Sequence, residues 1–128
     1  MNDKELLELA SKAVGMHSDH WAWDGSGMRE LAVHGVPHCG FKGPLWNPLT
    51  DGGDALLLAV TLKLSTYVFD HQTEIGKFGP GGFVKYALVA HEGDASADTR
   101  RAIVLVAADI GKAMLALPSS SDVSLTRI

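Results

Sequence analysis

The sequence predicts an α+β fold: a single small domain in which an antiparallel sheet of about four strands packs with three helices, in the order α-β-β-α-β-β-α. Two patterns support this prediction. Three segments carry apolar residues at helical spacing, and the two regions between them carry short aromatic and β-branched runs broken by glycine-rich turns. The length of 128 residues and the apolar content of 46% are typical of one globular domain, which we assign to residues 1–117.

The first predicted helix spans residues 3–14, where apolar side chains recur on one face and Gly15 follows as a stop. Residues 20–34 predict a hairpin, because Trp21 and Trp23 alternate around Ala22 and a DGSG turn follows. Residues 35–48 hold glycines and prolines with little periodicity. We expect that segment to be a loop.

The stretch WNPLTDGGDALLLAV leads into a second predicted helix, residues 52–63. Thr50 or Asp51 is placed to cap this helix, and the carboxylates of Asp51 and Asp54 oppose a bound phosphate. Two glycines in its first turn weaken the helix. Either burial of the apolar run compensates, or the glycines allow a neighbouring backbone to come close. On the first alternative, the buried side chains are Leu56, Leu57, Leu58, Ala59, Val60 and Leu62.

The second half of the chain predicts another hairpin and a long helix. Aromatic and β-branched residues favour strands at 66–71 and 83–91, connected by the polar residues 72–78 and a GPGG run. A continuous apolar face predicts a helix over residues 95–117, which Pro118 ends. We expect residues 118–128 to form a flexible tail.

Five candidate metal ligands fall within 23 positions. The spacings of three and four residues resemble those of zinc ligands, but one cysteine and two unequal histidine pairs do not complete a structural zinc motif. A zinc site and incidental exposed histidines therefore remain open alternatives. No catalytic signature surrounds the cysteine, and we assign no catalytic residues. The candidate ligands are His17, His20, His34, His38 and Cys39.

Tryptophans and an arginine pair are the candidate partner surface. Core packing is the commoner role of a tryptophan, whereas an exposed indole edge favours a protein partner. The arginines lie near Asp94 and Asp98, which predicts local ion pairs on a solvated face. The candidate residues are Trp21, Trp23, Trp46, Arg100 and Arg101.

Charge and composition restrict the kinds of partner and the cellular compartment that we expect. The net charge of −4 lacks the positive field on which non-specific nucleic-acid binding depends. No apolar run approaches the roughly 20 residues that span a bilayer, so we expect no membrane partner. The single cysteine and the polar start MNDKE favour a reducing cytoplasm.

Three segments together resemble a known group: MNDKELLELASKAVG, WNPLTDGGDALLLAVTL and ADTRRAIVLVAADIGKAM. They are similar to small uncharacterised proteins of tailed bacteriophages and prophages, including those labelled NinX-like. Residues 17–41 lie outside this resemblance. It implies a phage accessory protein in the cytoplasm of the bacterial host, with no activity, cofactor or catalytic residues to transfer.

The sequence therefore leads to three hypotheses. The first is a non-catalytic module that binds a host or phage protein and forms a homo-oligomer, because catalytic signatures are missing and the first half is rich in tryptophan. The second is a metal-dependent enzyme or metal-stabilised module that uses the histidine cluster. The third is a nucleic-acid accessory factor, which the acidic charge disfavours.

Overall fold

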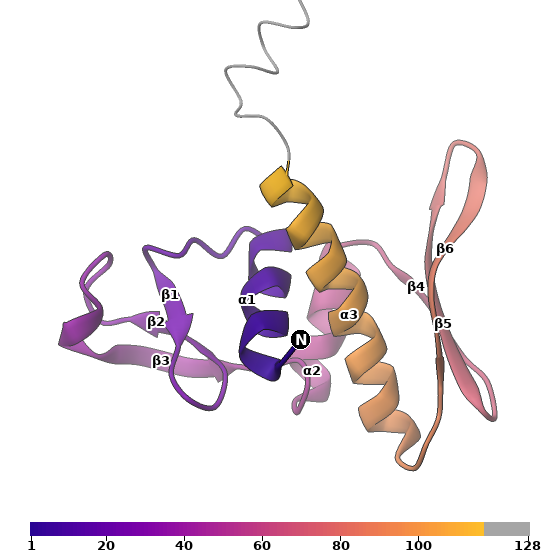
Figure 1. The fold of residues 1–128 in the computed structure, drawn as a ribbon, viewed down its shortest axis with the longest axis horizontal. Coiled ribbons are helices and arrows are strands. Elements are labelled where there is room, and N and C mark those ends of the chain that lie inside the picture. The colour runs from indigo at the N-terminus through magenta and orange to yellow at the C-terminus, as the bar shows by residue number, and fades with distance from the viewer. Residues whose placement is uncertain (117–128) are drawn as a thin grey trace, which may run out of the picture.

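Helices alternate with groups of three strands along the chain (Figure 1), in a computed structural model that describes residues 1–116. The helix α1 (Asp3–Ala13) precedes the first group of strands. The helix α2 (Gly52–Thr61) stands between the two groups, and α3 (Ala95–Ala116) follows the second. The first group holds β1 (Trp21–Trp23), β2 (Met28–Leu31), the 3₁₀ turn η1 (Pro37–Cys39) and β3 (Phe41–Trp46). The second holds β4 (Ser65–Val68), β5 (Gln72–Gly79) and β6 (Gly82–Ala90).

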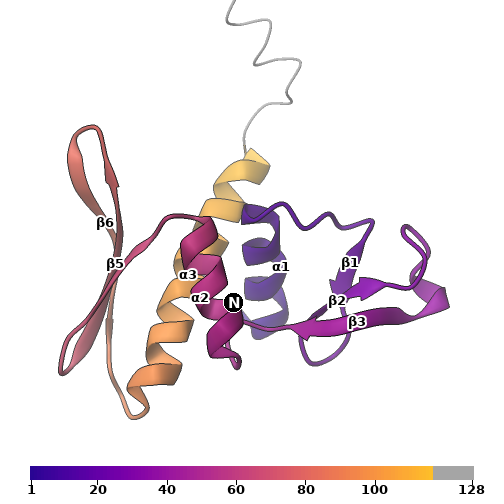
Figure 2. The same ribbon diagram turned by 180° about the vertical axis from the view of Figure 1, so that it is seen from behind.

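Each group of strands forms its own antiparallel sheet, in the orders β1-β2-β3 and β4-β5-β6. The helices lie between the two sheets, and α3 packs on the inner face of β4-β5-β6 (Figures 1 and 2). The α+β class is confirmed. Six strands in two sheets replace the predicted four in one sheet, so the helices do not all cover one face.

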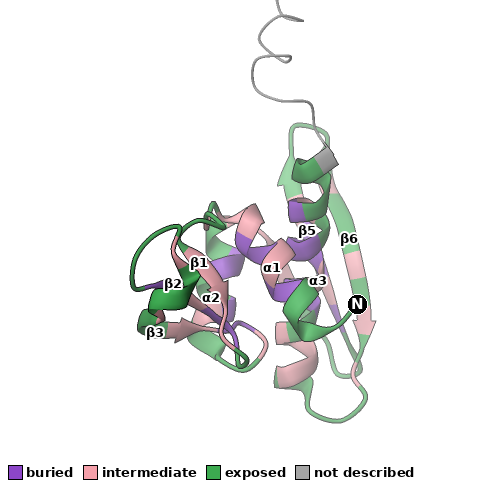
Figure 3. Ribbon diagram, turned by 60° about the vertical axis from the view of Figure 1, so that its left-hand side comes forward, coloured by how far each residue is buried: buried purple, intermediate pink, exposed green. Residues whose placement is uncertain are grey.

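The core lies where α1 and α3 meet, and the buried residues in Figure 3 gather along these helices. Leu6 and Leu7 of α1 are fully buried. Gly111 of α3 lies against the Leu9 carbonyl of α1, so closely that a Cβ added there would overlap it. The two backbones therefore touch at a point where only glycine fits.

The predicted loop at residues 35–48 is wrong, because it contains η1 and the strand β3. Pro44 and Gly43, which has a φ of 76°, broke the strand pattern. Both residues are tolerated because β3 is an edge strand of its sheet, where a missing N–H donor need not interrupt the ladder.

The predicted connection over residues 72–78 is also wrong, since it forms β5, the central strand of the second sheet. The turn to β6 is shorter than expected: Gly79 and Gly82 are paired in register, and Gly82 has a φ of 102° that favours glycine. The predicted flexible tail, 118–128, and the last residue of the predicted helix, Leu117, lie outside the described residues. Between residues 1 and 116, no helix is long and apolar enough to cross a bilayer.

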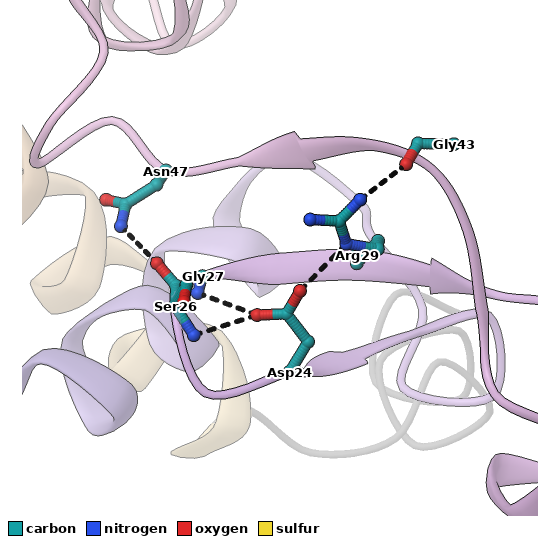
Figure 4. A network of polar contacts seen from close by, with 6 residues as sticks. All are labelled: Asp24, Ser26, Gly27, Arg29, Gly43 and Asn47. Carbon is teal, nitrogen blue, oxygen red and sulfur yellow. Dashed lines mark hydrogen bonds and ion pairs between the residues drawn. The ribbon is translucent and has the colours of Figure 1, made fainter.

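A polar network fixes the turn between β1 and β2 (Figure 4). Asp24 accepts hydrogen bonds from the backbone N–H of Ser26 and Gly27 at 2.8 and 3.1 Å, and Arg29 Nε donates to its second oxygen at 2.8 Å. Burial opposes ionisation of Asp24, but the hydrogen bonds from Ser26, Arg29 and Gly27 outweigh it and hold the pKa of Asp24 below its ordinary value.

The same network reaches the start of α2. Asn47 Nδ2 donates to the Ser26 carbonyl at 2.6 Å, and the Asn47 N–H donates to the Asp54 carboxylate at 2.9 Å. The side chain of Asp51 caps α2 by accepting from the Asp54 N–H at 2.8 Å, which confirms the predicted cap. Both aspartates thus accept from backbone donors: Asp51 caps α2, and Asp54 ties the helix to Asn47, which directly follows β3.

Candidate protein-binding surfaces

The outward side of α2 is apolar and exposed. The predicted burial of Leu56, Leu57 and Val60 is wrong: 65%, 61% and 62% of their surfaces are accessible to solvent. The inward side carries Ala55, Leu58 and Ala59, all buried. Gly53 precedes Leu56, Leu57 and Val60 by three, four and seven residues, so it lies on the same side of the helix as these exposed side chains. We call Gly53, Leu56, Leu57 and Val60 the α2 face.

A groove runs along each flank of the α2 face. One groove, of about 410 Å³, lies between α2, β4 and the start of α3, where Leu56 faces Val68 and Ile103. The other, of about 250 Å³, lies between α2, the end of α1 and the first sheet, where Leu57 faces Trp46 and Val14. Both grooves are lined mainly by apolar side chains. The α2 face is therefore a ridge between two apolar hollows.

The predicted partner residues fall partly on this surface. Trp21 and Trp46 line the groove beside Leu57, and Arg100 lines the groove beside Leu56. All three tryptophans, including Trp23, are half-buried against the core, so core packing is one of their roles. The structure thus brings Trp21, Trp46 and Arg100 to the two flanks of one helix.

The predicted ion pairs of the arginines with Asp94 and Asp98 are wrong. Arg100 Nε donates to the Leu49 carbonyl at 2.9 Å, and Arg101 lies 3.7 Å from the Asp3 carboxylate of α1. The two aspartates accept from backbone N–H groups near the start of α3 instead. Helix starts have free N–H donors, and these compete for nearby carboxylates.

A second exposed apolar surface is the outer side of the β4-β5-β6 sheet, which no other helix or strand among residues 1–116 covers (Figures 1 and 2). Tyr67 and Leu88 are both paired in register with Glu74 and therefore share its side of the sheet. The Phe83 ring contacts the rings of Tyr67, edge-on at 5.7 Å, and Phe78, at 5.0 Å between centroids. We call Tyr67, Phe78, Phe83 and Leu88 the sheet face.

Local structure holds the sheet face in place. The Phe83 ring lies over Gly76, where an added Cβ would overlap it, so glycine provides the seat for the ring. Lys85 lies 3.9 Å from Glu74 and adds a charged pair at the edge of the aromatic cluster. Phe78 is the most exposed of the four, at 62%. An apolar centre with a polar margin is typical of a protein-binding surface.

The candidate metal ligands are only partly assembled. The His20 ring stacks on the His34 ring at 3.8 Å, and His17 lies 5.9 Å from His20 between centroids. His34 Nε2 lies 2.7 Å from Glu30. This hydrogen bond, with the positive charge of Lys42, lowers the pKa of Glu30.

His38 and Cys39 belong to η1 and are exposed. Among residues 1–116, no three His, Cys, Asp or Glu side chains are grouped as ligands of a metal ion. A zinc site formed by the five residues stays a prediction.

Sequence reasoning missed one buried polar cluster. The Thr73 hydroxyl lies 2.7 Å from His91 Nε2 and 2.8 Å from the Thr99 hydroxyl, and it joins β5 to α3. A hydroxyl beside an imidazole is the arrangement of an activated nucleophile. Thr73 is fully buried, however, so its hydroxyl meets no substrate. The separation of 18 residues between Thr73 and His91 gave no signal in the sequence.

Comparison with family models, with curated proteins and with solved structures finds no match for this chain.

Proposed function

We propose that this protein is a non-catalytic protein-binding module, and that its sheet face binds the partner. The resemblance of its three helical segments to phage and prophage proteins leads us to propose a phage-encoded accessory protein in the host cytoplasm, with a host or phage protein as the partner. The aromatic cluster of Tyr67, Phe78 and Phe83 on an uncovered sheet is the single observation that carries the proposal.

The chemistry of the sheet face favours a partner protein with an apolar contact surface. Aromatic rings provide a large contact area at a low entropic cost and are enriched among the residues that dominate binding energy. The Glu74–Lys85 pair at the margin offers one charge of each sign to hydrogen-bonding groups of the partner. The absence of a catalytic signature in the sequence supports a binding role.

The test is affinity capture from bacterial cells with the full chain and two variants. Phe78→Ala with Leu88→Ala removes two exposed side chains from the sheet face, and both changes leave the buried side of the sheet intact. Val33→Ala removes an exposed valine outside the sheet face and is the matched control. We expect one protein to bind the wild type and Val33→Ala, with at least about tenfold less bound to the double variant.

The result must then be repeated with the purified partner. Equal capture by all three forms contradicts the sheet face as the binding surface. A partner that binds only when zinc is present instead supports the metal-stabilised module, for which the contacts among His17, His20 and His34 are the favouring observation. Elemental analysis of protein purified without a metal-affinity step separates these two functions.

A further inference from the structure

The α2 face is an unusual surface for a helix in water. Leu56, Leu57 and Val60 expose most of their area side by side. In Figure 2, α2 lies in front of the other helices, and no other helix or strand of residues 1–116 lies in front of it. The one charged side chain of α2, Asp54, is bonded to the Asn47 N–H at the base of the helix. A charge-free apolar ridge of this kind calls for an apolar cover.

Gly53 adds a second observation. Its φ is not in the left-handed region, so the backbone does not require glycine. A Cβ at this position would meet only the Asp51 carboxylate, at 3.1 Å, whereas the Cβ of a residue at Gly111 would overlap a backbone. No close approach among the described residues explains the cost of a glycine inside α2. Apart from that carboxylate, no other described side chain lies within 4 Å of a Cβ at Gly53, which is at one end of the apolar ridge.

The glycine at position 53 leaves a gap at one end of the apolar ridge. The ridge of one copy and the gap of another are complementary when two α2 helices lie antiparallel. Gly53, Leu56, Leu57 and Val60 follow the spacing i, i+3, i+4, i+7, which forms a single stripe along the helix. Suppose that two copies of α2 lie antiparallel about a twofold axis between Leu56 and Leu57. Leu56 of each copy then faces Leu57 of the other, and Val60 faces Gly53. Val60, at the bulkier end of the ridge in one copy, therefore enters the gap at Gly53 of the other copy.

The charges at the two ends of α2 agree with this pairing. Asp51 at the N-terminus and Lys63 just beyond the C-terminus are both exposed, and the antiparallel register brings them near each other across the axis. Lys63 contacts no carboxylate within residues 1–116. It is also the one non-glycine residue with positive φ in that range, at 58°. This left-handed conformation ends α2, and across it the Leu64 N–H donates to the Ala59 carbonyl at 2.8 Å.

We propose that a second copy of this chain covers the α2 face, in an antiparallel α2–α2 pair with Val60 packed over Gly53 of the other copy. A twofold interface must be complementary to itself, and this face provides both the ridge and the gap. Ten helical residues are only about 15 Å long, so the pair also needs contacts along the two flanking grooves to approach the roughly 800 Å² per partner of a stable interface. We expect a dissociation constant on the order of micromolar.

Sedimentation equilibrium of the full chain from about 1 μM to 1 mM tests the proposal. Gly53→Leu fills the gap that receives Val60, and within the single copy its Cβ meets only the Asp51 carboxylate, at 3.1 Å. We expect this variant to fold and to raise the dissociation constant about 30-fold or more. Gly93→Leu is the matched control, because Gly93 has open space and, like Gly53, no positive φ. It should associate as the wild type does.

A compensating variant tests the register. Gly53→Val with Val60→Ala moves the bulk from one end of the ridge to the other, so it should recover much of the association that Gly53→Val alone loses. Circular dichroism of each variant confirms that it is folded. A wild type that stays monomeric at 1 mM overturns the proposal, even if a different protein binds the α2 face. A dimer that Gly53→Leu leaves unchanged also overturns it.

Discussion

Helices α1 and α2 are 11 and 10 residues long, and each begins with a side-chain cap, from Asn2 and Asp51. They differ in what they turn to solvent. α1 buries Leu6 and Leu7 and exposes charged side chains, including a Lys4–Glu8 pair at 3.6 Å. α2 buries mainly small side chains and exposes large apolar ones. α1 is therefore complete within one copy of the chain, whereas α2 presents an uncovered surface.

The glycines of the two contact regions show the same difference. Gly111 lies against the backbone of α1 in a contact within the chain, whereas a Cβ at Gly53 would meet only the Asp51 carboxylate. We infer that the contact of Gly111 with α1 is needed for the fold of the single chain, and that Gly53 is needed for the association of two chains.

Alanine at the two glycines should have very different effects on stability. Gly111→Ala places a Cβ against the Leu9 carbonyl and should lower the free energy of unfolding by about 3 kcal/mol, because α1 and α3 must separate. Gly53→Ala removes a flexible residue from α2 but places its Cβ 3.1 Å from the capping carboxylate of Asp51, so we expect the free energy of unfolding to change by less than about 1 kcal/mol. Denaturation by urea, at a protein concentration where the wild type is monomeric, measures both. Equal losses would contradict the difference between the two glycines.

Leucine truncation should separate the helices in the same way. Leu7→Ala leaves a cavity in the core and should cost 2–5 kcal/mol, about the usual range for a buried leucine. Leu57→Ala should change the stability of the monomer by less than about 0.5 kcal/mol, since Leu57 is mostly exposed. It should nevertheless weaken dimerisation in sedimentation experiments. A large loss of monomer stability in Leu57→Ala would mean that α2 already has its cover within the chain.

Lys63→Gly should improve the monomer and impair the dimer. Glycine relieves the positive φ at the end of α2, so we expect about 1 kcal/mol of added stability. The same change removes the cation that faces Asp51 of the second copy, and the dissociation constant should rise severalfold. Lys63→Arg keeps the cation and the side chain at the same position, so it is the matched control and should associate as the wild type does. If Lys63→Gly associates as tightly as the wild type, the pairing with Asp51 is wrong.

The smallest effect concerns pH and the support of α2. The pKa of Asp24 is lowered in the folded state, so its contribution to stability is present above the unfolded pKa, about 3.9, and is lost as the pH falls through the folded value. Asp24→Asn should cost about 0.5 kcal/mol at pH 7 and progressively less below pH 4. Denaturation curves from pH 7 to pH 3 measure this. The cost of Leu7→Ala should not follow that dependence, because it comes from apolar packing.

Much of the fold could be predicted from the sequence, because the helix caps and apolar spacings are local signals. The cap by Asp51 and the hairpin at Trp21 and Trp23 are examples. β3 and β5 were missed for a different reason. Gly43 and Pro44 are acceptable in β3 because that strand is at an edge, and the polar residues Thr73, Glu74 and Lys77 are acceptable in β5 because β4 and β6 pair with it on both sides. Both facts depend on which strands become neighbours.

The candidate surfaces were harder to predict. The run ALLLAV is apolar at every position, so its sequence does not indicate which side faces the core. The packing of α2 against the rest of the chain decides that Leu58 is buried and Leu57 is exposed. The sequence did raise the possibility that the glycines at 52 and 53 allow a close approach. No neighbouring backbone among the described residues lies within 4 Å of a Cβ at Gly53, and this directs that possibility toward a second copy.

Disulfide cross-linking tests the central claim about α2 most directly. In a Cys39→Ser background, which removes the exposed native thiol, Gly53→Cys and Val60→Cys are prepared as separate proteins and then mixed under mild oxidation. The antiparallel register predicts that the mixture forms cross-linked dimers, while each protein alone forms few, because its own cysteines lie about 10 Å apart along the paired helices. No enrichment in the mixture, or equal cross-linking in each single protein, would contradict the proposed pair.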